Sequence, residues 1–305
     1  MPTPAYRPHC STKWWSAYCL VQVALLLAGC GPPENRDGTA RHGVIAFGPN
    51  LTETVFALGQ GDRIVGVTTF CDYPPEAKLK KRVGGYLDPD LETITALAPE
   101  LIILPGKMEK LSALAEQNHF KILNAHMDDL KTIHHSIRAI GGALGSTPQA
   151  EALCKKIDDD LAAVRNAVKD GPRAKVLIIN SRQGHDLNNL FAVGRMSFVS
   201  ELTDIAGGDN IFNDTDKPYF EASKESVVAR APDVIIEFHS GENISAEEQA
   251  RYVADWDQLD AVPAVQEKRV YLFLESYGLR PGPRIGLIAA RIATLLHPNV
   301  SVHIP

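Results

Sequence analysis

Histidine and cysteine are the residue types in this chain that could ligate a metal or act as nucleophiles, and they are scattered along it. The 305 residues include ten histidines and five cysteines. His134 and His135 are adjacent, so on a helix they would point to different faces and could not share a metal ion. His239, just after the apolar run 234–236, and Cys71 are the secondary candidates for contacting a metal centre. We therefore expect no resident metal and no intrinsic cofactor.

Sequence signatures of catalysis are absent as well. The chain has no Gly-x-Ser-x-Gly nucleophile elbow, no His-Glu-x-x-His zinc motif and no phosphate-binding loop. The glycine-rich segment 141–145 follows a helical pattern and not a strand, so it is expected to end that helix. We predict a protein that is not an enzyme. A hydrolase or cyclase on the same scaffold is the rival hypothesis, because a fold does not determine its function.

Cys30 is the cysteine whose neighbours predict a specific modification. Leu27-Ala28-Gly29-Cys30 resembles the lipobox of bacterial lipoproteins, in which the leader is cut before the cysteine and the thiol is acylated. Its fatty chains would then hold the protein on a membrane. The alternative is an ordinary signal peptide with a cysteine there by chance. Beyond the leader, Cys71 and Cys154 either pair in the exported protein or stay as thiols.

The segment ahead of this motif has the pattern of a secretory signal peptide. Residues 1–29 contain Arg7 and Lys13 but no acidic residue, and the apolar stretch 17–28 is too short to span a bilayer as a helix. We predict a signal peptide over 1–29 and a polar tether over 30–43. The protein would be exported and anchored to the bacterial cell membrane, facing the periplasm or the extracytoplasmic space.

Removal of that leader changes the charge that a partner would meet. The formal net charge is −6, and because the leader carries +2, the rest of the chain carries −8. This net negative charge argues against a nucleic-acid partner, since phosphate backbones are bound by clustered Lys and Arg. With 45% hydrophobic and 22% charged residues, the composition is that of an ordinary folded protein and not of a disordered one.

Short apolar runs alternate with amphipathic stretches through the rest of the chain. Buried strands are predicted at 44–47, 64–67, 101–104, 122–123, 176–179, 234–236 and 270–273. Helical patterns separate or follow them at 51–58, 108–117, 130–144 and 283–296. Such alternation is typical of parallel sheets covered by helices. The sequence therefore predicts the α/β class.

One helix between the two strand-rich regions is predicted to be long. Thr147 is the expected N-cap, Pro148 stands at the first helical position, and apolar residues recur at three- and four-residue steps until Gly171-Pro172. The predicted parts of the mature chain are an N-terminal lobe over 44–146, a backbone helix over 147–170 and a C-terminal lobe over 171–305.

An internal repeat supports two related lobes. Residues 92–103, Glu-Thr-Ile-Thr-Ala-Leu-Ala-Pro-Glu-Leu-Ile-Ile, match residues 225–236, Glu-Ser-Val-Val-Ala-Arg-Ala-Pro-Asp-Val-Ile-Ile, at a constant spacing. Each copy is typical of a short helix, a turn marked by proline and a buried strand. Two copies in register on either side of a long helix indicate two lobes joined by that helix. Two-lobed proteins bind ligands between their lobes.

Taken in order, these motifs carry a family resemblance. The chain resembles the substrate-binding proteins of ABC importers that have a rigid helical backbone, the cluster that binds cobalamin, iron–siderophores and haem. The matching pieces, besides the repeat, are 48–53, 65–68, 71–75, 83–86, 207–212 and 279–284. The run 72–75 followed by Gly85-Tyr86 is most similar to the cobalamin-binding branch. The resemblance implies two Rossmann-like lobes with central β-sheets, one long rigid helix and a ligand cleft between the lobes.

The resemblance also implies which side chains contact the ligand. Aromatic contacts are expected from Phe70, Tyr73 and Tyr86 on the first lobe and from Tyr219, Phe220 and Tyr277 on the second. Polar contacts are expected from Asn50, Asp72, Ser276 and Arg280. A corrin has a wide apolar face that aromatic rings can cover and amide-bearing edges for a few polar groups. For each ring, packing in the core is the alternative.

Glu92 and Glu225 begin the two repeated segments. In the family, one acid on each lobe meets arginines on the two halves of the membrane permease dimer, and such opposite charges would orient docking. The alternative is an acid favoured by the dipole at a helix N-terminus, which explains each Glu singly but not their recurrence in register.

These features together predict a lipid-anchored receptor. It would capture a corrinoid, a cobalamin-like molecule, and deliver it to the permease of an ABC importer. A receptor for an iron–siderophore or haem is the alternative, and a sensor that binds a partner is a further one. Because a long helix bridges the lobes, only a small closure is expected on binding.

Overall fold

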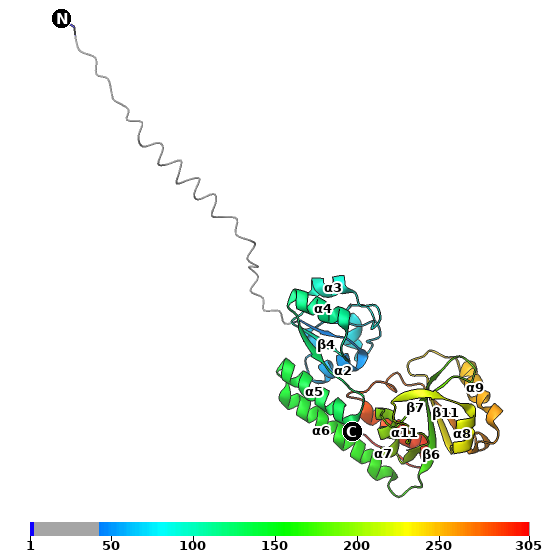
Figure 1. Ribbon diagram of the computed structural model, residues 1–305. Helices are drawn as coiled ribbons and strands as arrows, with labels where there is room; N and C mark the ends of the chain where they lie inside the picture. Colours follow the sequence, from blue (N-terminus) through cyan, green and yellow to red (C-terminus); the bar gives the residue numbers. More distant parts are fainter. Residues whose placement is uncertain (3–42, 305) are drawn as a thin grey trace. The chain divides into compact units, whose positions relative to one another are not determined.

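The structure is a computed structural model that describes residues 1–2 and 43–304. Residues 43–304 lie within one compact unit (Figure 1). The predicted lipidation site Cys30 lies outside the described residues, as do the predicted signal peptide beyond residue 2 and the predicted tether up to residue 42, so these stay predictions. Within the described ranges, no helix is both long and apolar enough to cross a bilayer.

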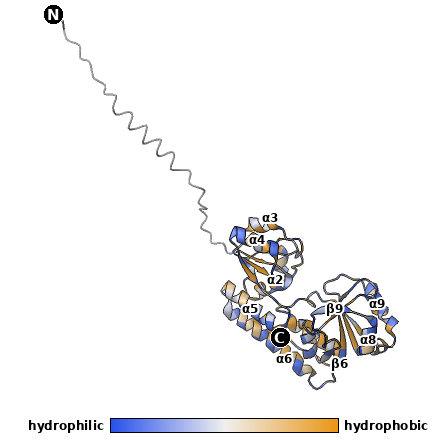
Figure 2. Cartoon of the chain, in the orientation of Figure 1, coloured by the Kyte–Doolittle hydropathy of each residue, from blue (hydrophilic) through white to orange (hydrophobic). Residues whose placement is uncertain are grey.

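A parallel sheet forms the centre of the first lobe. In spatial order, its strands are β3 (Lys81–Arg82), β2 (Ile64–Val67), β1 (Val44–Ala46), β4 (Leu101–Leu104) and β5 (Lys121–Asn124). All neighbouring pairs run parallel. Every residue of β1 and β4 is buried, because helices cover both faces of the sheet. These apolar strands stand out in Figure 2.

A mixed sheet forms the centre of the second lobe. In spatial order, its strands are β11 (Val270–Phe273), β10 (Val234–Phe238), β6 (Ala174–Arg182), β7 (Leu190–Val193) and β9 (Tyr219–Ala222), with β8 (Gly208–Asn210) beside the start of β6. β6 runs parallel to β10 and β8, whereas β7 pairs antiparallel with both β6 and β9. The sequence analysis missed β7, β8 and β9. Polar residues leave β8 and β9 without a clear apolar run, whereas β7 is a short apolar run that was not recognised.

Helices cover both sheets (Figure 1). Those of the first lobe are α2 (Pro49–Ala57), α3 (Leu91–Leu97), α4 (Glu109–Asn118) and α5 (Leu130–Leu144). Those of the second lobe are α7 (Phe198–Ile205), α8 (Lys224–Arg230), α9 (Ala246–Ala254), α10 (Pro263–Gln266) and α11 (Ile285–Leu296). Short 3-10 turns are η1 (Gly61–Arg63), η2 (Pro75–Leu79) and η3 (Asp255–Leu259). In the first lobe, α2 and α5 pack on one face of the sheet, and α3 and α4 on the other.

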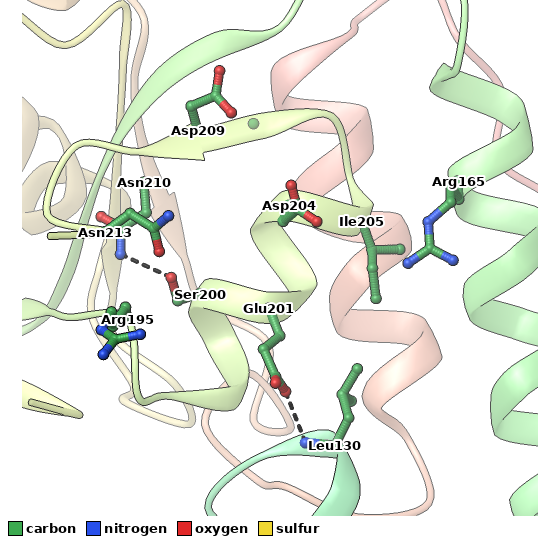
Figure 3. Close-up of a pocket in the computed structure, with 11 residues that line it drawn as sticks. Leu130, Arg165, Arg195, Ser200, Glu201, Asp204, Ile205, Asp209, Asn210 and Asn213 are labelled. Carbon is green, nitrogen blue, oxygen red and sulfur yellow. Dashed lines mark hydrogen bonds between the residues drawn. The ribbon is translucent and has the colours of Figure 1, made fainter. Parts of the chain in front are cut away.

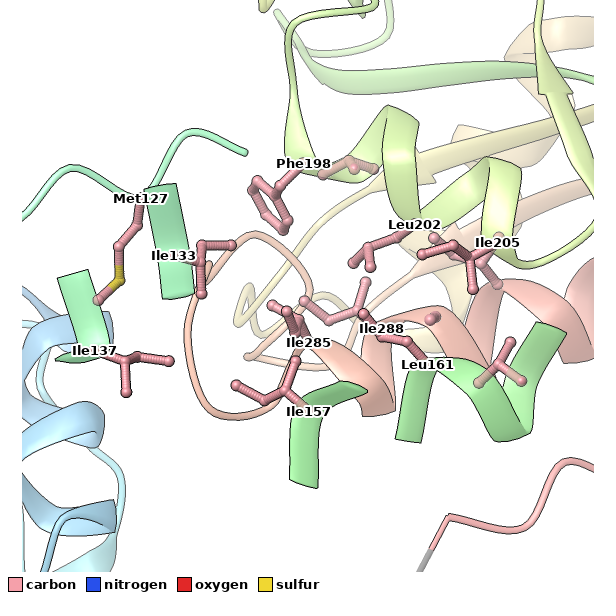
Figure 4. Close-up of a cluster of buried hydrophobic side chains, with 14 of the residues drawn as sticks. Met127, Ile133, Ile137, Ile157, Leu161, Phe198, Leu202, Ile205, Ile285 and Ile288 are labelled. Atoms are coloured by element: carbon pink, nitrogen blue, oxygen red, sulfur yellow. The ribbon is translucent and has the colours of Figure 1, made fainter. Parts of the chain in front are cut away.

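The helix α6 (Thr147–Val168) joins the lobes. It packs on α5 of the first lobe and on α7 and α11 of the second. Ile157 and Leu161 on its inner face belong to a core that both lobes share (Figure 4). The helix begins one residue earlier than predicted: its N-cap is Ser146 and not Thr147, because the chain enters α6 directly from the left-handed Gly145 that ends α5. The predicted α/β fold of two lobes joined by a long helix is confirmed.

The two repeated segments fold alike. Asp90 caps α3 and Ser223 caps α8, and each side chain accepts a hydrogen bond from a backbone N–H of the first turn. At the other end, Ala98 and Ala231 take the left-handed conformation, with φ of 44° and 47°. This conformation ends a helix and turns the chain into the following proline and strand. The repeat is therefore a shared helix–turn–strand unit, one in each lobe.

Truncation of Ile157 tests the shared core. This side chain is fully buried, so we expect Ile157→Ala to lower the free energy of unfolding by about 2–5 kcal/mol. Asn166 lies on the exposed face of the same helix, so Asn166→Ala should change it by less than about 0.5 kcal/mol. Urea unfolding followed by circular dichroism measures both. Equal stability of the two variants would contradict a packed junction at α6.

Candidate ligand-binding site

A cavity of about 650 Å³ lies between loops of the two lobes. Its first-lobe lining consists of Pro49, Thr69, Phe70, Cys71, Asp72, Lys78 and Arg82. Its second-lobe lining consists of Ser240, Gly241, Glu242, Ser276, Leu279 and Arg280. A volume of this order is typical of small-molecule sites.

Strand direction explains where this cavity forms. In the first lobe, residues 69–72 follow β2, and in the second lobe residues 240–242 follow β10 and residues 276–280 follow β11. These loops leave the carboxyl ends of parallel strands, which is the edge at which open α/β sheets bind ligands. The cavity therefore lies where this fold class forms its binding sites.

Arg82 fixes the first-lobe wall of the cavity. Its Nη1 donates hydrogen bonds to the carbonyl oxygens of Thr68 and Cys71, each at 2.9 Å. The loop between these carbonyls presents Phe70, which is 74% exposed. An exposed ring on a fixed loop offers a flat apolar surface at low entropic cost.

A network of four charged residues joins the lobes beside the cavity. Glu53 of α2 is 3% exposed and accepts hydrogen bonds from Nε and Nη2 of Arg284, at 2.8 and 2.6 Å. Arg280 donates to Glu53 at 3.3 Å and to Asp72. Partial burial alone would raise the pKa of Asp72, but the hydrogen bond and charge of Arg280 outweigh it and lower that pKa below its ordinary value. Both carboxylates belong to the first lobe and both guanidiniums to the second, so the network ties the two walls together.

Two of the predicted aromatic contacts pack on this network. The guanidinium carbon of Arg284 lies 4.0 Å from the ring centroid of Tyr73 and 5.2 Å from that of Tyr277. Tyr277 also packs edge-on against Phe273. Neither tyrosine is part of the cavity lining. The two rings cover the Arg284 cation, and their contact with a ligand stays a prediction.

Part of the predicted contact set does come together in the cavity. Phe70 and Asp72 from the first lobe and Ser276 and Arg280 from the second all line it. Asn50 directly follows the lining residue Pro49, and its side-chain amide donates to the sulfur of Met127 at 3.5 Å. The geometry thus gives one aromatic and three polar members of the predicted set a common cavity.

The other three predicted aromatic contacts are not part of the cavity lining. Tyr86 is exposed in the loop after β3. Tyr219, at the start of β9, accepts a hydrogen bond from the hydroxyl of Ser197 at 3.4 Å. Phe220 packs edge-on against Phe212 in the core of the second lobe. Their roles toward a ligand also stay predictions.

His239 anchors the second-lobe wall. Its Nδ1 lies 2.8 Å from Glu242 and its Nε2 lies 2.9 Å from Glu237. Glu237 is fully buried and also accepts hydrogen bonds from Arg182 at 2.6 Å and from Trp256 at 3.0 Å. Burial alone would raise the pKa of Glu237, but these three donors outweigh it and lower that pKa. Glu237 is therefore ionised, and it holds His239 in place from the protein interior.

The two secondary metal candidates have other partners. Both ring nitrogens of His239 face carboxylates, and the sulfur of Cys71 lies 3.2 Å from the hydroxyls of Thr52 and Thr68. Across the part of the chain that the structure describes, no group of three or more His, Cys, Asp or Glu is arranged to hold a metal ion. Cys71 and Cys154 are separate buried thiols, which decides the question that the sequence left open.

Glu92 and Glu225 stand at the second position of α3 and α8, and both side chains are exposed. Helix α3 precedes β4 and helix α8 precedes β10, and both strands belong to parallel pairs. Because each helix runs antiparallel to the strand that follows it, its first turn lies at the edge of the sheet where the parallel strands end. The two acids therefore lie at the edge of each sheet that also carries the cavity.

The cavity also contains charged residues that the sequence analysis missed, namely Lys78, Arg82 and Glu242. It missed the pair Glu53–Arg284 too, because these residues lie 231 positions apart and no local pattern couples them. A signal did exist for Glu242. The polar run 239–242 follows a predicted buried strand, and polar residues at the carboxyl end of a parallel strand are site candidates.

A second hollow, of about 520 Å³, lies beside α7 (Figure 3). Glu201 in its lining accepts a hydrogen bond from the backbone N–H of Leu130 at 2.7 Å, so its carboxylate caps the start of α5. Burial raises the pKa of Glu201 above its ordinary value. Arg195 in the same lining pairs with Asp216. The carboxylate of Glu201 is thus used in a contact between the lobes, which makes this hollow the weaker candidate site.

Comparison with known proteins agrees with this geometry. A family model described as "Periplasmic binding protein" matches residues 44–277. A vitamin B12-binding protein of Pectobacterium carotovorum is 28% identical over 255 residues, which cover 83% of this chain and 87% of the relative. A Bacillus subtilis protein described as an uncharacterized ABC transporter substrate-binding lipoprotein is 24% identical over 317 residues, covering 93% and 96%. The solved structure of a periplasmic haem-binding protein from Roseiflexus matches with a TM-score of 0.70 and 24% identity, covering 85% of this chain and 99% of that one.

Removal of the Glu53 charge tests the network between the lobes. In Glu53→Gln, Arg284 loses a bidentate partner in a buried place, so we expect the free energy of unfolding to fall by about 3 kcal/mol. Glu116 is an exposed residue of α4, and Glu116→Gln should change it by less than about 0.5 kcal/mol. Urea unfolding measures both, and a Glu53 variant no less stable than the control would show that the network does not hold the lobes.

Proposed function

We propose that this chain, which belongs to the periplasmic binding protein family, captures a corrinoid between its lobes and delivers it to the membrane permease of an ABC importer. The observation that carries this proposal is the cavity to which loops of both lobes contribute. A family of binding proteins also supports a receptor over the rival enzyme. An iron–siderophore or haem receptor is the second candidate.

The cavity lining favours a ligand whose metal is already fully coordinated. Haem iron in proteins takes axial ligands from His, Cys, Met or Tyr, and of these types the described lining contains only Cys71. The sulfur of Cys71 is buried against two threonine hydroxyls. A cobalamin brings both axial ligands of its cobalt, so it needs only packing and hydrogen bonds. The B12-binding relative supports the same choice, whereas the haem-binding structure, at its low identity, supports the fold alone.

Export and lipid anchoring are part of the same proposal. The Leu27-Ala28-Gly29-Cys30 motif supports acylation of Cys30, and the relative from Bacillus subtilis is described as a lipoprotein. An anchored receptor facing the periplasm or the extracytoplasmic space would stay close to the permease that it serves. Two lipid chains would give stable anchoring, since a single chain binds membranes only marginally.

Calorimetry of the mature domain against cyanocobalamin, haemin and a ferric siderophore tests the ligand. We expect saturable binding of cyanocobalamin without product. Haemin should not acquire the absorption bands of an axially ligated haem, because the described lining presents no exposed axial ligand. Binding of haemin or the siderophore alone would overturn the corrinoid assignment in favour of the second candidate, and turnover of any of the three would favour the enzyme.

A matched pair of aromatic variants serves as control for that measurement. Phe70 lies in the cavity lining, whereas Phe191 is exposed on β7 outside it. Truncation of a buried aromatic contact in a binding site costs about 2 kcal/mol, so Phe70→Ala should weaken cyanocobalamin binding roughly 30-fold and Phe191→Ala should not. Similar affinities of the two variants would place the ligand elsewhere.

We also propose Glu92 and Glu225 as the contacts to the two halves of the permease. Both acids are exposed, both occupy the same position in a repeated unit, and both lie at the cavity edge of their sheets. In Glu225, hydrogen bonds from its own backbone N–H and from Ser223 lower the pKa of the carboxyl group, so this residue stays ionised. A two-lobed protein with matched acids fits a two-fold symmetric, basic partner.

The double variant Glu92→Ala/Glu225→Ala should retain its affinity for the ligand while transport by the intact importer falls. The reason is that both side chains lie outside the cavity lining, whereas docking depends on their charge. Uptake of labelled cyanocobalamin and calorimetry measure the two effects separately. Glu116→Ala/Glu267→Ala, which removes two other exposed acids near the carboxyl ends of α4 and α10, is the control. A loss of ligand binding, or equal uptake in both double variants, would contradict the docking role.

A further inference from the structure

The second-lobe wall presents one carboxylate, that of Glu242, to the cavity. Its side chain is 54% exposed, and the loop that carries it is fixed to the end of β11. The backbone N–H of His239 donates to the carbonyl of Phe273 at 2.9 Å, and that of Gly241 to the carbonyl of Leu274 at 3.2 Å. Gly241 adopts a φ of 78°, a left-handed conformation that suits glycine at this turn. The backbone of this wall is thus held in one place.

The partner of Glu242 is a buried histidine that carries a positive charge. Nδ1 and Nε2 of His239 both face carboxylate oxygens, those of Glu242 and Glu237. An ionised carboxylate can only accept hydrogen bonds, so both ring nitrogens must donate, which makes the ring an imidazolium. Burial alone would lower the pKa of His239, but the hydrogen bonds and charges of the two glutamates outweigh it and raise that pKa.

On the side of the protein interior, His239 is held by a second glutamate, Glu237. Glu237, which bonds its Nε2, is itself bonded by Arg182 and Trp256. A continuous chain of hydrogen bonds therefore runs from the core through Glu237 and His239 to Glu242 on the cavity wall. This support fixes the position of the Glu242 carboxylate before any ligand binds, and preorganisation of that kind lowers the cost of binding.

The facing wall adds donors, beside the carboxylate of Asp72. Lys78 and Arg82 of the first lobe line the same cavity, and their side chains can only donate. A carboxamide has an N–H₂ group that donates and a carbonyl that accepts, so it can use both walls. A carboxylate has no donor for Glu242 and is repelled by its charge. At Glu242 itself, an amide is therefore favoured over an acid, whereas Lys78 and Arg82 can donate to the carbonyl of either.

We propose that Glu242, positioned by the His239 imidazolium, is the residue that selects ligands with amide N–H donors on their periphery. This inference rests on the proposed receptor function and adds to it the chemistry that the cavity recognises. Glu242 would contact the ligand directly, and His239 is a positioning residue that acts through Glu242.

Calorimetry with two probes tests the selection: cyanocobalamin, and its derivative in which one peripheral carboxamide is hydrolysed to a carboxylate. Wild type should prefer cyanocobalamin. Glu242→Gln should weaken cyanocobalamin binding about tenfold, because a hydrogen bond to a charged group is lost, and should narrow or reverse the preference, because the repulsion disappears. Glu247→Gln, which makes the same change on exposed α9 outside the cavity lining, should leave both affinities unchanged.

The outcomes separate this inference from the function on which it rests. Wild type that binds neither probe overturns the proposed corrinoid receptor and this inference with it. Wild type that binds, with the same preference in Glu242→Gln as in Glu247→Gln, overturns this inference alone. A preference that narrows only in Glu242→Gln supports it.

The positioning role of His239 has its own readout in the pH profile of binding. Since its pKa is raised, the imidazolium persists to higher pH than in an ordinary histidine and is lost as pH rises through that pKa, so wild-type affinity should fall as pH rises. The His239→Gln variant should bind cyanocobalamin about tenfold more weakly at neutral pH, and it should lack the fall in affinity at alkaline pH (the alkaline limb of the profile). The other titratable and charged groups packed around or behind this ring are Glu237, Glu242, Tyr252, Glu248, Asp255, Arg182 and His185. An alkaline limb that persists unchanged in His239→Gln belongs to one of those groups and overturns the positioning role.

Discussion

The buried ion pair between Glu53 and Arg284 is the contact on which the arrangement of the site depends. Burying two charges is costly, and attraction offsets that cost only where the geometry is good and the remaining donors are satisfied. Both conditions are met, because the guanidinium bonds both oxygens of Glu53 and lies over two tyrosine rings. Arg280 and Asp72 extend the pair to the cavity lining. The positions of both walls therefore follow from one contact between α2 and the loop that precedes α11.

Two other contacts between the lobes act in the same direction. The helix α6 packs on α5 on one side and on α11 on the other, within a single hydrophobic core. Where α5 begins, Glu201 caps its first turn and the backbone N–H of Phe198 donates to the carbonyl of Asp128 at 2.9 Å. The Glu53–Arg284 network, the core around α6 and the hydrogen bonds at the start of α5 are three separate contacts that oppose rotation of one lobe against the other. A cavity held in this way is largely formed before a ligand arrives, which lowers the entropic cost of binding.

The sequence predicted those parts of the molecule that depend on local patterns. Fully buried strands such as β4 and β10 produce apolar runs, and α5 was predicted with its observed bounds. The strands β8 and β9 were missed because polar residues interrupt their short runs. The same limit applies to the site: Phe70 and Arg280 line the cavity, but Tyr73 and Tyr277 pack on Arg284. An aromatic residue in a loop shows that a ring is available, and only the fold decides whether it meets a ligand or a neighbouring cation.

Capping and packing account for most of the repeated unit in the two lobes. Its N-caps and left-handed alanines explain why helix, turn and strand recur, because each ends or begins an element. They do not explain the acid at the second helical position. Among the described helices, α2, α5, α6, α10 and α11 begin without any acid in the first turn, so a helix of this protein does not require one. Exposed acids also begin α4 and α9, at Glu109 and Glu247. What sets Glu92 and Glu225 apart is their matched position in the repeated unit of each lobe, and the proposed docking to a partner that touches both lobes rests on that match.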